Sequence, residues 1–501
     1  MKRISRRDFI KTVAVGMAAA GSGLGARAAR AKAKRKPNIV FVLADDLGWR
    51  DVGFHGAMFF ETPNIDKLAR EGMIFNQFYS GGPNCAPTRA CIMTGMYSPR
   101  TKLYTPGGKS KGNPKLMRLL VPTRGNPAGD KELVSRNDSI LPEHTSIAEV
   151  LKSAGYATAR IGKWHLGRDT QGFDVSSCNG KDGPGHKHYG SVTVARTITD
   201  RAVKFIEDNK DRPFFLYVAH WDVHGPIRAL KDVVAKYQKK KDGWNNTNAE
   251  KINPTYAGMI EAVDTSVARL RAKLADLGLD KNTLFVFSSD NGGTQVTTVQ
   301  PLRGGKGALF EGGIRVSTCA AWPGVVAPGS TCDVPLTSVD FMPTFAEVAG
   351  AKLPDSQPVD GESFVTLLRG GDKLTRESIF WHFPLYLQGS RSAVVKPVFG
   401  TDRPYWRGVP ATVMRKGDWK LFYFYEDKSI ELYNVRRDVG EKTDVAAKFP
   451  DRAAAMKTEL LAWVRKTKAP TPSSVNPAFD PKATGGGARR KGKRRRKGKQ
   501  T

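Results

Sequence analysis

The chain has 501 residues, of which 40% are hydrophobic, and a formal net charge of +32. This length and apolar content exclude a chain without a hydrophobic core and allow a large domain with an appendage. Residues 1–36 carry +10 and residues 489–499 carry +9, so the remainder carries +13 and favours an anionic substrate or anionic surroundings.

The N-terminus, residues 1–33, is predicted to be a targeting segment. It reads SRRDFIK from Ser5 to Lys11, and a weakly apolar stretch from Val13 to Ala20 follows. The pair Arg6–Arg7 in this setting is similar to a twin-arginine export signal. The apolar stretch is too short and too rich in Gly and Ala to span a bilayer stably. We therefore expect export by the twin-arginine route, which carries folded proteins, to the periplasm or the medium.

Pairs of oxygen-bearing side chains follow two predicted strands. The stretch Pro37–Ala44 is continuously apolar and rich in β-branched residues, as expected of a strand buried on both faces, and Asp45 and Asp46 come directly after it. A later apolar strand delivers Asp290 and Asn291. Carboxylate and amide oxygens suit a hard divalent cation, whereas the alternative is a solvated pair of loop acids.

A cysteine lies at the start of a predicted helix, Thr88–Met96. Pro87 should keep Ala86 out of the helix, so that Cys85 lies in the loop before it. The open amides of a helix start attract negative charge and are expected to lower the pKa of a thiol there. The alternative for a lone cysteine is a buried, inert thiol.

Basic and imidazole side chains follow further strands. Lys163 and His165 are two residues apart and would share a face in extended backbone. Such a pair can hold an oxyanion and move a proton. His224 also follows a buried strand, and His220 is more readily explained as a structural residue. Lys306 lies in a glycine-rich segment, where the backbone can approach a ligand closely.

These motifs lie at the ends of successive buried strands separated by helices, a pattern that predicts an α/β fold. We expect a large, mostly parallel mixed sheet flanked by helices over residues 37–375, and a smaller C-terminal α+β domain with an antiparallel sheet over residues 376–468. The expected strands are 37–44, 73–78, 156–161, 214–219, 283–288, 378–382, 411–415, 419–425 and 429–434. The expected helices are 62–72, 88–96, 141–154, 193–209, 256–277, 340–349 and 452–466.

Two polar segments are expected outside the core. Residues Thr101–Ser139 are rich in Gly, Pro and Lys and form either a wall that contacts a polyanion or a solvated loop. Residues 469–501 are predicted to be a disordered basic tail, which is either simply solvated or a tether to polyanions.

The remaining cysteines leave the question of disulfides open. Cys91 and Cys319 are expected to be buried free thiols, because one lies on a predicted helix and the other in an apolar strand. An exported enzyme can contain disulfides, but the pairing among Cys91, Cys178, Cys319 and Cys332 does not follow from the sequence.

Several of these motifs together resemble a known family. The segment Cys85-x-Pro87-x-Arg89, followed by Thr94–Gly95, resembles the signature of the type I sulfatases of the alkaline phosphatase superfamily, with Thr88 where serine is common. The strings PNIVFVLADDLG, GKWHLG and SDNGG resemble further sulfatase motifs and follow in the expected order. The resemblance runs from about Pro37 to Trp463.

The resemblance implies an arylsulfatase-like sulfuric-ester hydrolase whose cysteine, Cys85, is oxidised to Cα-formylglycine by a formylglycine-generating enzyme. It also implies one divalent cation, Ca²⁺, held by Asp45, Asp46, modified Cys85, Asp290 and Asn291. The catalytic residues that it implies are Cys85, Arg89, Lys163, His165, His224 and Lys306.

The basic surplus and the predicted export favour a sulfated polysaccharide or oligosaccharide as substrate, with aryl sulfates as surrogates. No nucleic acid partner is expected. Two alternatives remain open at this point: a phosphonate or phosphodiester hydrolase of the same superfamily, and a catalytically silent protein that binds sulfated glycans.

Overall fold

The computed structural model describes residues 35–107, 110–121, 134, 136–167, 171–177, 190–245, 251–388 and 406–483. The predicted export signal, Cys178 and the basic run from residue 489 lie outside these ranges. Pro37 begins the compact unit that contains all the elements below. None of the helices in the described ranges combines the length and apolar character that a membrane span requires.

The largest sheet has eight strands in the order β5-β4-β6-β1-β7-β8-β2-β9. Neighbours run parallel except β8, which is antiparallel to both β7 and β2. The strands are β1 (Asn38–Ala44), β2 (Met73–Phe75), β4 (Ala157–Gly162), β5 (Val175–Ser177), β6 (Phe214–Ala219), β7 (Thr283–Ser289), β8 (Thr318–Ala321) and β9 (Ser330–Cys332). A separate short pair joins β3 (Phe78–Tyr79) to β10 (Leu336–Thr337).

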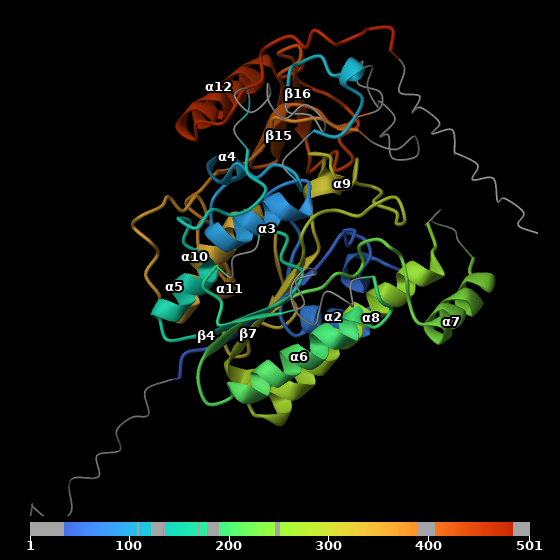
Figure 1. Ribbon diagram of the computed structural model, residues 1–501, viewed down its shortest axis with the longest axis vertical. Helices are drawn as coiled ribbons and strands as arrows, with labels where there is room; N and C mark the ends of the chain where they lie inside the picture. The colour runs from blue at the N-terminus through green and yellow to red at the C-terminus, as the bar shows by residue number, and fades with distance from the viewer. Residues whose placement is uncertain are drawn as a thin grey trace, which may run out of the picture. The chain divides into compact units, whose positions relative to one another are not determined.

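Helices cover both faces of this sheet (Figure 1). Alternate side chains of the central strand β1 enter two different cores, as the period of a strand requires. Ile39, Phe41 and Leu43 belong to the core that includes residues of α3 (Cys85–Thr94), α5 (Ile147–Ser153), α10 (Phe341–Ala349) and α11 (Val365–Leu368). Val40 and Val42 belong to the core that includes residues of α2 (Pro63–Arg70), α6 (Val194–Asp208), α7 (Lys231–Asp242) and α8 (Pro254–Asp276).

The C-terminal part forms a four-stranded antiparallel sheet with the order β11-β14-β15-β16. Its strands are β11 (Ser378–Phe383), β14 (Ala411–Lys416), β15 (Trp419–Phe424) and β16 (Ile430–Asn434), and a separate pair joins β12 (Leu387–Gln388) to β13 (Trp406–Gly408). One face of the sheet packs on α12 (Pro450–Lys466). The other face shares a core with Tyr79, Leu309 and Ile314 of the larger sheet's domain. The predicted fold class is therefore confirmed.

Within the described ranges, six further short helices connect these elements: η1 (Gly53–His55), α4 (Ser98–Thr101), η2 (Pro114–Leu116), η4 (Asp280–Asn282), α9 (Glu311–Ile314) and η5 (Ser338–Asp340).

Two predicted helix starts were wrong. Helix α3 begins at Cys85, three residues earlier than expected, and includes Ala86. Pro87 is compatible with this start, because the first amides of a helix have no intrahelical acceptor and its missing N–H removes no bond. Helix α5 begins at Ile147 rather than Leu141, since Ser146 and Glu149 form a capping box that fixes its N-terminus.

The predicted strand 73–78 is divided between β2 and β3.

The tail and the polar insertion also differ from the prediction, because the described parts pack together. Leu116, Met117 and Leu119 are buried in the core of the C-terminal sheet. Asn476 donates from Nδ2 to the carbonyl oxygens of Pro114 and Met117, at 2.9 and 2.8 Å. Residues 470–483 are thus part of the fold, and the insertion is partly an internal layer rather than a solvated loop.

Candidate active site

Two neighbouring strands place the acidic residues side by side. Ala44 at the end of β1 pairs with Ser289 at the end of β7, so Asp45 and Asp290 follow at the same edge of the sheet. The backbone N–H of Asp46 donates to Oδ1 of Asp290 at 3.2 Å. Asp46 has a φ of 67°, a left-handed conformation that turns the chain sharply after the strand.

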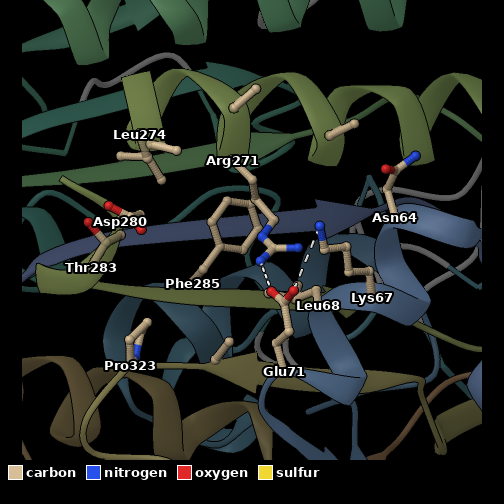
Figure 2. A pocket seen from close by; sticks show the side chains of 14 residues that line it. Asn64, Lys67, Leu68, Glu71, Arg271, Leu274, Asp280, Thr283, Phe285 and Pro323 are labelled. Atoms are coloured by element: carbon tan, nitrogen blue, oxygen red, sulfur yellow. Dashed lines mark hydrogen bonds and ion pairs between the residues drawn. The ribbon is translucent and has the colours of Figure 1, made fainter. Parts of the chain in front are cut away.

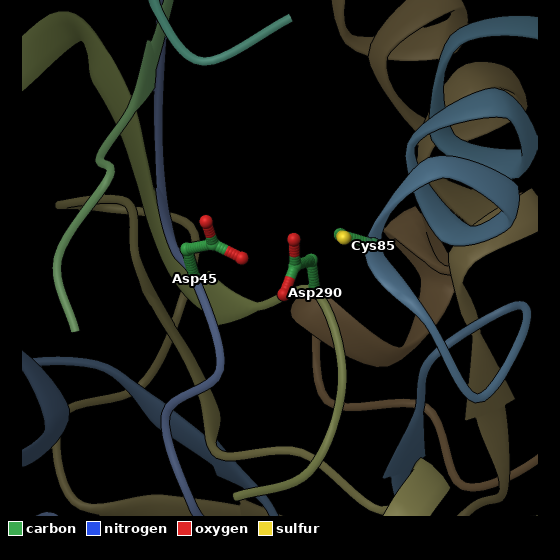
Figure 3. A group of neighbouring side chains, drawn as sticks. All are labelled: Asp45, Cys85 and Asp290. Atoms are coloured by element: carbon green, nitrogen blue, oxygen red, sulfur yellow. The ribbon is translucent and has the colours of Figure 1, made fainter. Parts of the chain in front are cut away.

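Cys85 faces this acidic pair from the first turn of α3 (Figure 3). Its Sγ and carboxylate oxygens of Asp45 and Asp290 all lie within 4.8 Å of one another, and all three side chains are buried. Burial raises the pKa of the Cys85 thiol despite the nearby charges of Lys163 and Lys306. The expectation that the helix start would lower this pKa was therefore wrong, because desolvation exceeds the effect of the surrounding cations.

Arg89 lies one turn further along α3 and is fully buried. It donates to Oδ2 of Asp290 from both Nε and Nη2, at 2.9 and 2.7 Å. Its Nη1 donates to the carbonyl oxygen of Lys163 and to the hydroxyl of Tyr217. These bonds hold the guanidinium in one orientation, and its charge helps to lower the pKa of Asp290 to about 2 against the effect of burial.

Two lysines reach the same acids from other segments. Lys163 follows β4, and its Nζ donates to Oδ2 of Asp45. Lys306 lies in the loop before α9, and its Nζ is 2.5 Å from Oδ1 and 2.7 Å from Oδ2 of Asp46. Three buried or nearly buried cations thus meet three carboxylates around one thiol.

Two histidines lie at this cluster, and two others make structural contacts. His165 is accessible to solvent, and desolvation together with the charges of Lys163 and Arg89 lowers its pKa to about 2. Nε2 of His224 lies 3.7 Å from Oδ2 of Asp46, and its Nδ1 is 2.7 Å from the carbonyl oxygen of Gly225. His220 is buried against Ser266, and His382 is buried between Thr412 and Pro470, so both are structural.

His165 also corrects a prediction. Its φ is 66°, so the chain from Lys163 to His165 is not extended, and the two side chains reach the site through a turn.

The donor set fits a hard cation. Oδ1 of Asp45 and Oδ1 of Asn291 are both buried and have no hydrogen-bond partner. Uncompensated buried oxygens are costly unless a cation or another donor satisfies them. Both atoms belong to residues that the sequence assigned to the metal, and oxygen ligands of this kind suit Ca²⁺ or Mg²⁺.

A cavity of about 480 Å³ between α2, α8 and β7 is a different site (Figure 2). Its basic residues are neutralised internally, since Arg271 and Lys67 both pair with Glu71. Thr283 lines it at the start of β7, whereas Asp290 follows the end of that strand. The cavity is therefore separated from Cys85 by the length of a strand.

Comparison with known proteins identifies the architecture around Cys85. The family model for sulfatases matches residues 37–351, more than half of the chain. The chain belongs to the sulfatase family. A second model, described as the C-terminal part of N-sulphoglucosamine sulphohydrolase, matches residues 305–466 of this sulfatase. The predictions of a type I sulfatase and of a sulfuric-ester hydrolase are thus confirmed.

Individual proteins similar to this chain include named sulfatases. A sulfatase from Formosa agariphila is 30% identical, covering 87% of this chain and 90% of its own. The N-acetylgalactosamine-6-sulfatase of Sus scrofa is 29% identical, covering 86% and 84%. The crystal structure of Ps i-CgsB in complex with k-i-k-neocarrahexaose superposes with a TM-score of 0.66 at 27% identity, covering 88% of this sulfatase and 95% of that chain.

The structure brings all ten residues of the predicted site into one cluster. It also adds residues that the sequence did not indicate. Tyr217 lies within an apolar strand and gives no signal of its contact with Arg89. Asp51 accepts from Gly48 and Tyr256 and so fixes the loop that follows Asp46. In the sequence, only the position of Asp51 five residues after Asp46 indicated that it could lie near the site.

Proposed function

We propose that this sulfatase releases inorganic sulfate from a sulfated polysaccharide or its oligosaccharides by means of a nucleophile formed from Cys85. The observation that carries the proposal is the buried cluster of the thiol, Asp45 and Asp290, with Arg89 and two lysines around it. A phosphonate or phosphodiester hydrolase remains an outcome of the substrate test described below.

Cys85 is proposed to act as Cα-formylglycine rather than as a thiol. Because burial raises its pKa, the unmodified side chain is a neutral thiol and a weak nucleophile at neutral pH. In the modification, a separate oxidising enzyme that uses dioxygen replaces the CH₂–SH group by an aldehyde and removes the sulfur. The hydrated aldehyde supplies a hydroxyl group in place of the thiol.

We assign roles in the reaction to the charged and imidazole side chains around Cys85. Lys163 and Lys306 bind sulfate oxygens, and Arg89 stabilises the negative charge that develops near Cys85. His165 is accessible to solvent beside Lys163, and we assign it the role of proton acceptor. His224 is solvent-accessible at the edge of the cluster and donates a proton to the leaving oxygen of the substrate.

A cation, proposed to be Ca²⁺, would be held by Asp45, Asp46, Asp290, Asn291 and the modified side chain of residue 85. When bound, it supplies positive charge that polarises the sulfate ester and lowers the pKa of a neighbouring hydroxyl. The uncompensated oxygens of Asp45 and Asn291 support this assignment.

The substrate class rests on charge and on relatives. The chain without its basic ends keeps a surplus of +13, which favours a polyanion. The relatives include an N-acetylgalactosamine-6-sulfatase and a protein crystallised with a neocarrahexaose. We further propose export by the twin-arginine route, on the sequence of residues 1–33 alone.

The test is the mass of the tryptic peptide Glu71–Arg89 from protein made in the native host. A peptide lighter by the difference between a thiol and an aldehyde, and reactive to a hydrazide, is expected. Intact cysteine throughout an active preparation would overturn the proposed nucleophile. Turnover of matched sulfate, phosphate and phosphonate esters then separates the reaction classes, and greater activity on phosphonates would overturn the sulfate assignment.

A further inference from the structure

A guanidinium from the C-terminal part of the chain reaches the loop that carries Lys306. Arg407 lies in the middle of the short strand β13, and its Nη1 donates to the carbonyl oxygen of Lys306 at 3.2 Å. The Nζ of Lys306 lies at the other end of that side chain, on Asp46. The two cations are therefore about one lysine side chain apart, which is also the scale that separates substituents on a sugar ring.

Close backbone contact fixes Arg407 in this place. A side chain at Gly408 would meet the carbonyl oxygen of Gly307 at 2.8 Å, and one at Gly307 would collide with Leu387 and lie 3.5 Å from Nε of Arg407. The loop at Gly307 and the strand β13 at Gly408 therefore both need glycine in order to approach each other. Trp406 is buried against Tyr386, with ring centroids 4.8 Å apart, and anchors the other side of the strand.

The positive charge of Arg407 has no carboxylate partner within the described part of the fold. No carboxylate among the described residues forms an ion pair with it, and its buried Nε has no hydrogen-bond partner. Burial lowers the pKa of Arg407 while the charge of Asp46 raises it, which shows that the guanidinium lies within the electrostatic field of the site. An unpaired, half-buried guanidinium is costly unless something anionic completes it.

We propose that Arg407 binds a second anionic group of the substrate, a carboxylate or a second sulfate next to the sulfate that is cleaved. This inference rests on the proposed function, and it narrows the substrate class to glycans with two neighbouring anionic groups. The planar fork of Arg407 matches either oxyanion and can donate two parallel hydrogen bonds to it. Arg407 is then a specificity-determining residue, while Lys163 and Lys306 serve the sulfate that is released.

The test measures binding without turnover. In a Cys85→Ala background, calorimetry compares N-acetylgalactosamine 6-sulfate with two probes that add one anionic group: N-acetylgalactosamine 4,6-disulfate, and the disaccharide of N-acetylgalactosamine 6-sulfate with a hexuronic acid. At least one probe is expected to bind about tenfold more tightly than the monosulfated sugar, as one charge-assisted contact implies. The probe that binds more tightly shows whether the second anionic group is a sulfate or a carboxylate.

The variants decide whether Arg407 is responsible. Arg407→Ala should remove the gain, and Arg407→Lys should restore part of it, because charge remains but the fork is lost. Arg436→Ala is the matched control, since Arg436 is exposed and lies near Asp418 in the same C-terminal part. The proposal is overturned if neither probe binds more tightly than the monosulfated sugar, or if the gain survives in Arg407→Ala. Failure of the wild-type enzyme to hydrolyse any sulfate ester would instead overturn the proposed function.

Discussion

Two clusters of buried charge among the described residues differ in a way that bears on function, and we propose that only the one around Cys85 reacts. Around Cys85, buried oxygens of Asp45 and Asn291 have no hydrogen-bond partner among the described residues, and His165 and His224 are accessible to solvent. Around Lys420, by contrast, the ammonium lies between Glu311 and Glu441, at 3.0 and 2.9 Å, and all three residues are fully buried.

Buried charge is therefore not by itself the mark of an active site. The cluster around Lys420 joins the C-terminal sheet to α9, because Glu441 also accepts from the backbone N–H of Glu311 at 2.7 Å. It has no described route to solvent and serves to hold two parts of the chain together. The cluster around Cys85 is distinguished by the solvent access at His165 and His224 and by Oδ1 of Asn291, which has neither a hydrogen bond nor an ion pair among the described residues.

The largest expected effect tests the structural cluster. Lys420→Met should lower the free energy of unfolding by about 3–5 kcal/mol, because it leaves Glu311 and Glu441 buried without their shared cation. Denaturant unfolding measures the loss, with exposed Lys352→Met as control. The kcat of the protein that remains folded should change less than about threefold, and a loss of kcat as large as that of Lys163→Ala would erase the distinction between the clusters.

The reactive cluster is tested by Lys163→Ala. The barrier should rise by about 2–4 kcal/mol, a loss of roughly 10²–10³-fold in kcat, because one charge that faces the sulfate is removed. Turnover of 4-nitrophenyl sulfate by fully modified protein measures it, with Lys352→Ala as control. Near-normal turnover would show that Lys163 is not part of the reacting site.

The dependence of stability on pH sharpens the comparison. Burial raises the pKa of Glu441 to about 7, above its unfolded value of 4.5. Between these two pH values the folded state holds a proton that the unfolded state has lost, so stability falls as pH rises, by up to about 3 kcal/mol. Glu441→Gln should flatten this fall. If the unfolding free energy of the variant falls with pH as steeply as that of the wild type, a group other than Glu441 is responsible for the fall.

The smallest expected effect concerns the tail. Asn476→Ala removes two hydrogen bonds, to the carbonyl oxygens of Pro114 and Met117, and should cost about 1–2 kcal/mol in unfolding free energy. Exposed Lys482→Ala in the same segment serves as the control. No loss of stability would mean that residues 470–483 contribute little to the fold.

Much of the architecture followed from the sequence because its strands are continuous apolar runs. β1, β6 and β7 were each predicted to within a residue or two, and the acids that follow them were correctly placed at one edge of a sheet. The pattern of period two and the rule that ligands bind at strand ends were sufficient for this.

What the sequence did not reveal depends on contacts between distant segments. The pKa of Cys85 depends on how deeply the thiol is buried, which no local pattern records. Arg407 is one arginine among many in a basic chain, and only the approach of Gly408 to Gly307 in the folded protein brings it next to the loop that carries Lys306. Residues 470–483 lack apolar periodicity, so their packing on the insertion was not predictable.

The depth of the thiol also bears on when the proposed modification of Cys85 could take place. Cys85 is 1% exposed in the folded protein, and the indole of Trp381 from the C-terminal sheet donates to the carbonyl oxygen of Ser80, five residues before it. A side chain enclosed in this way is out of reach of another enzyme's active site. On the proposal that Cys85 is oxidised, the oxidising enzyme would have to meet residue 85 while the ribosome is still adding the C-terminal strands, or soon after release, before the chain closes around it.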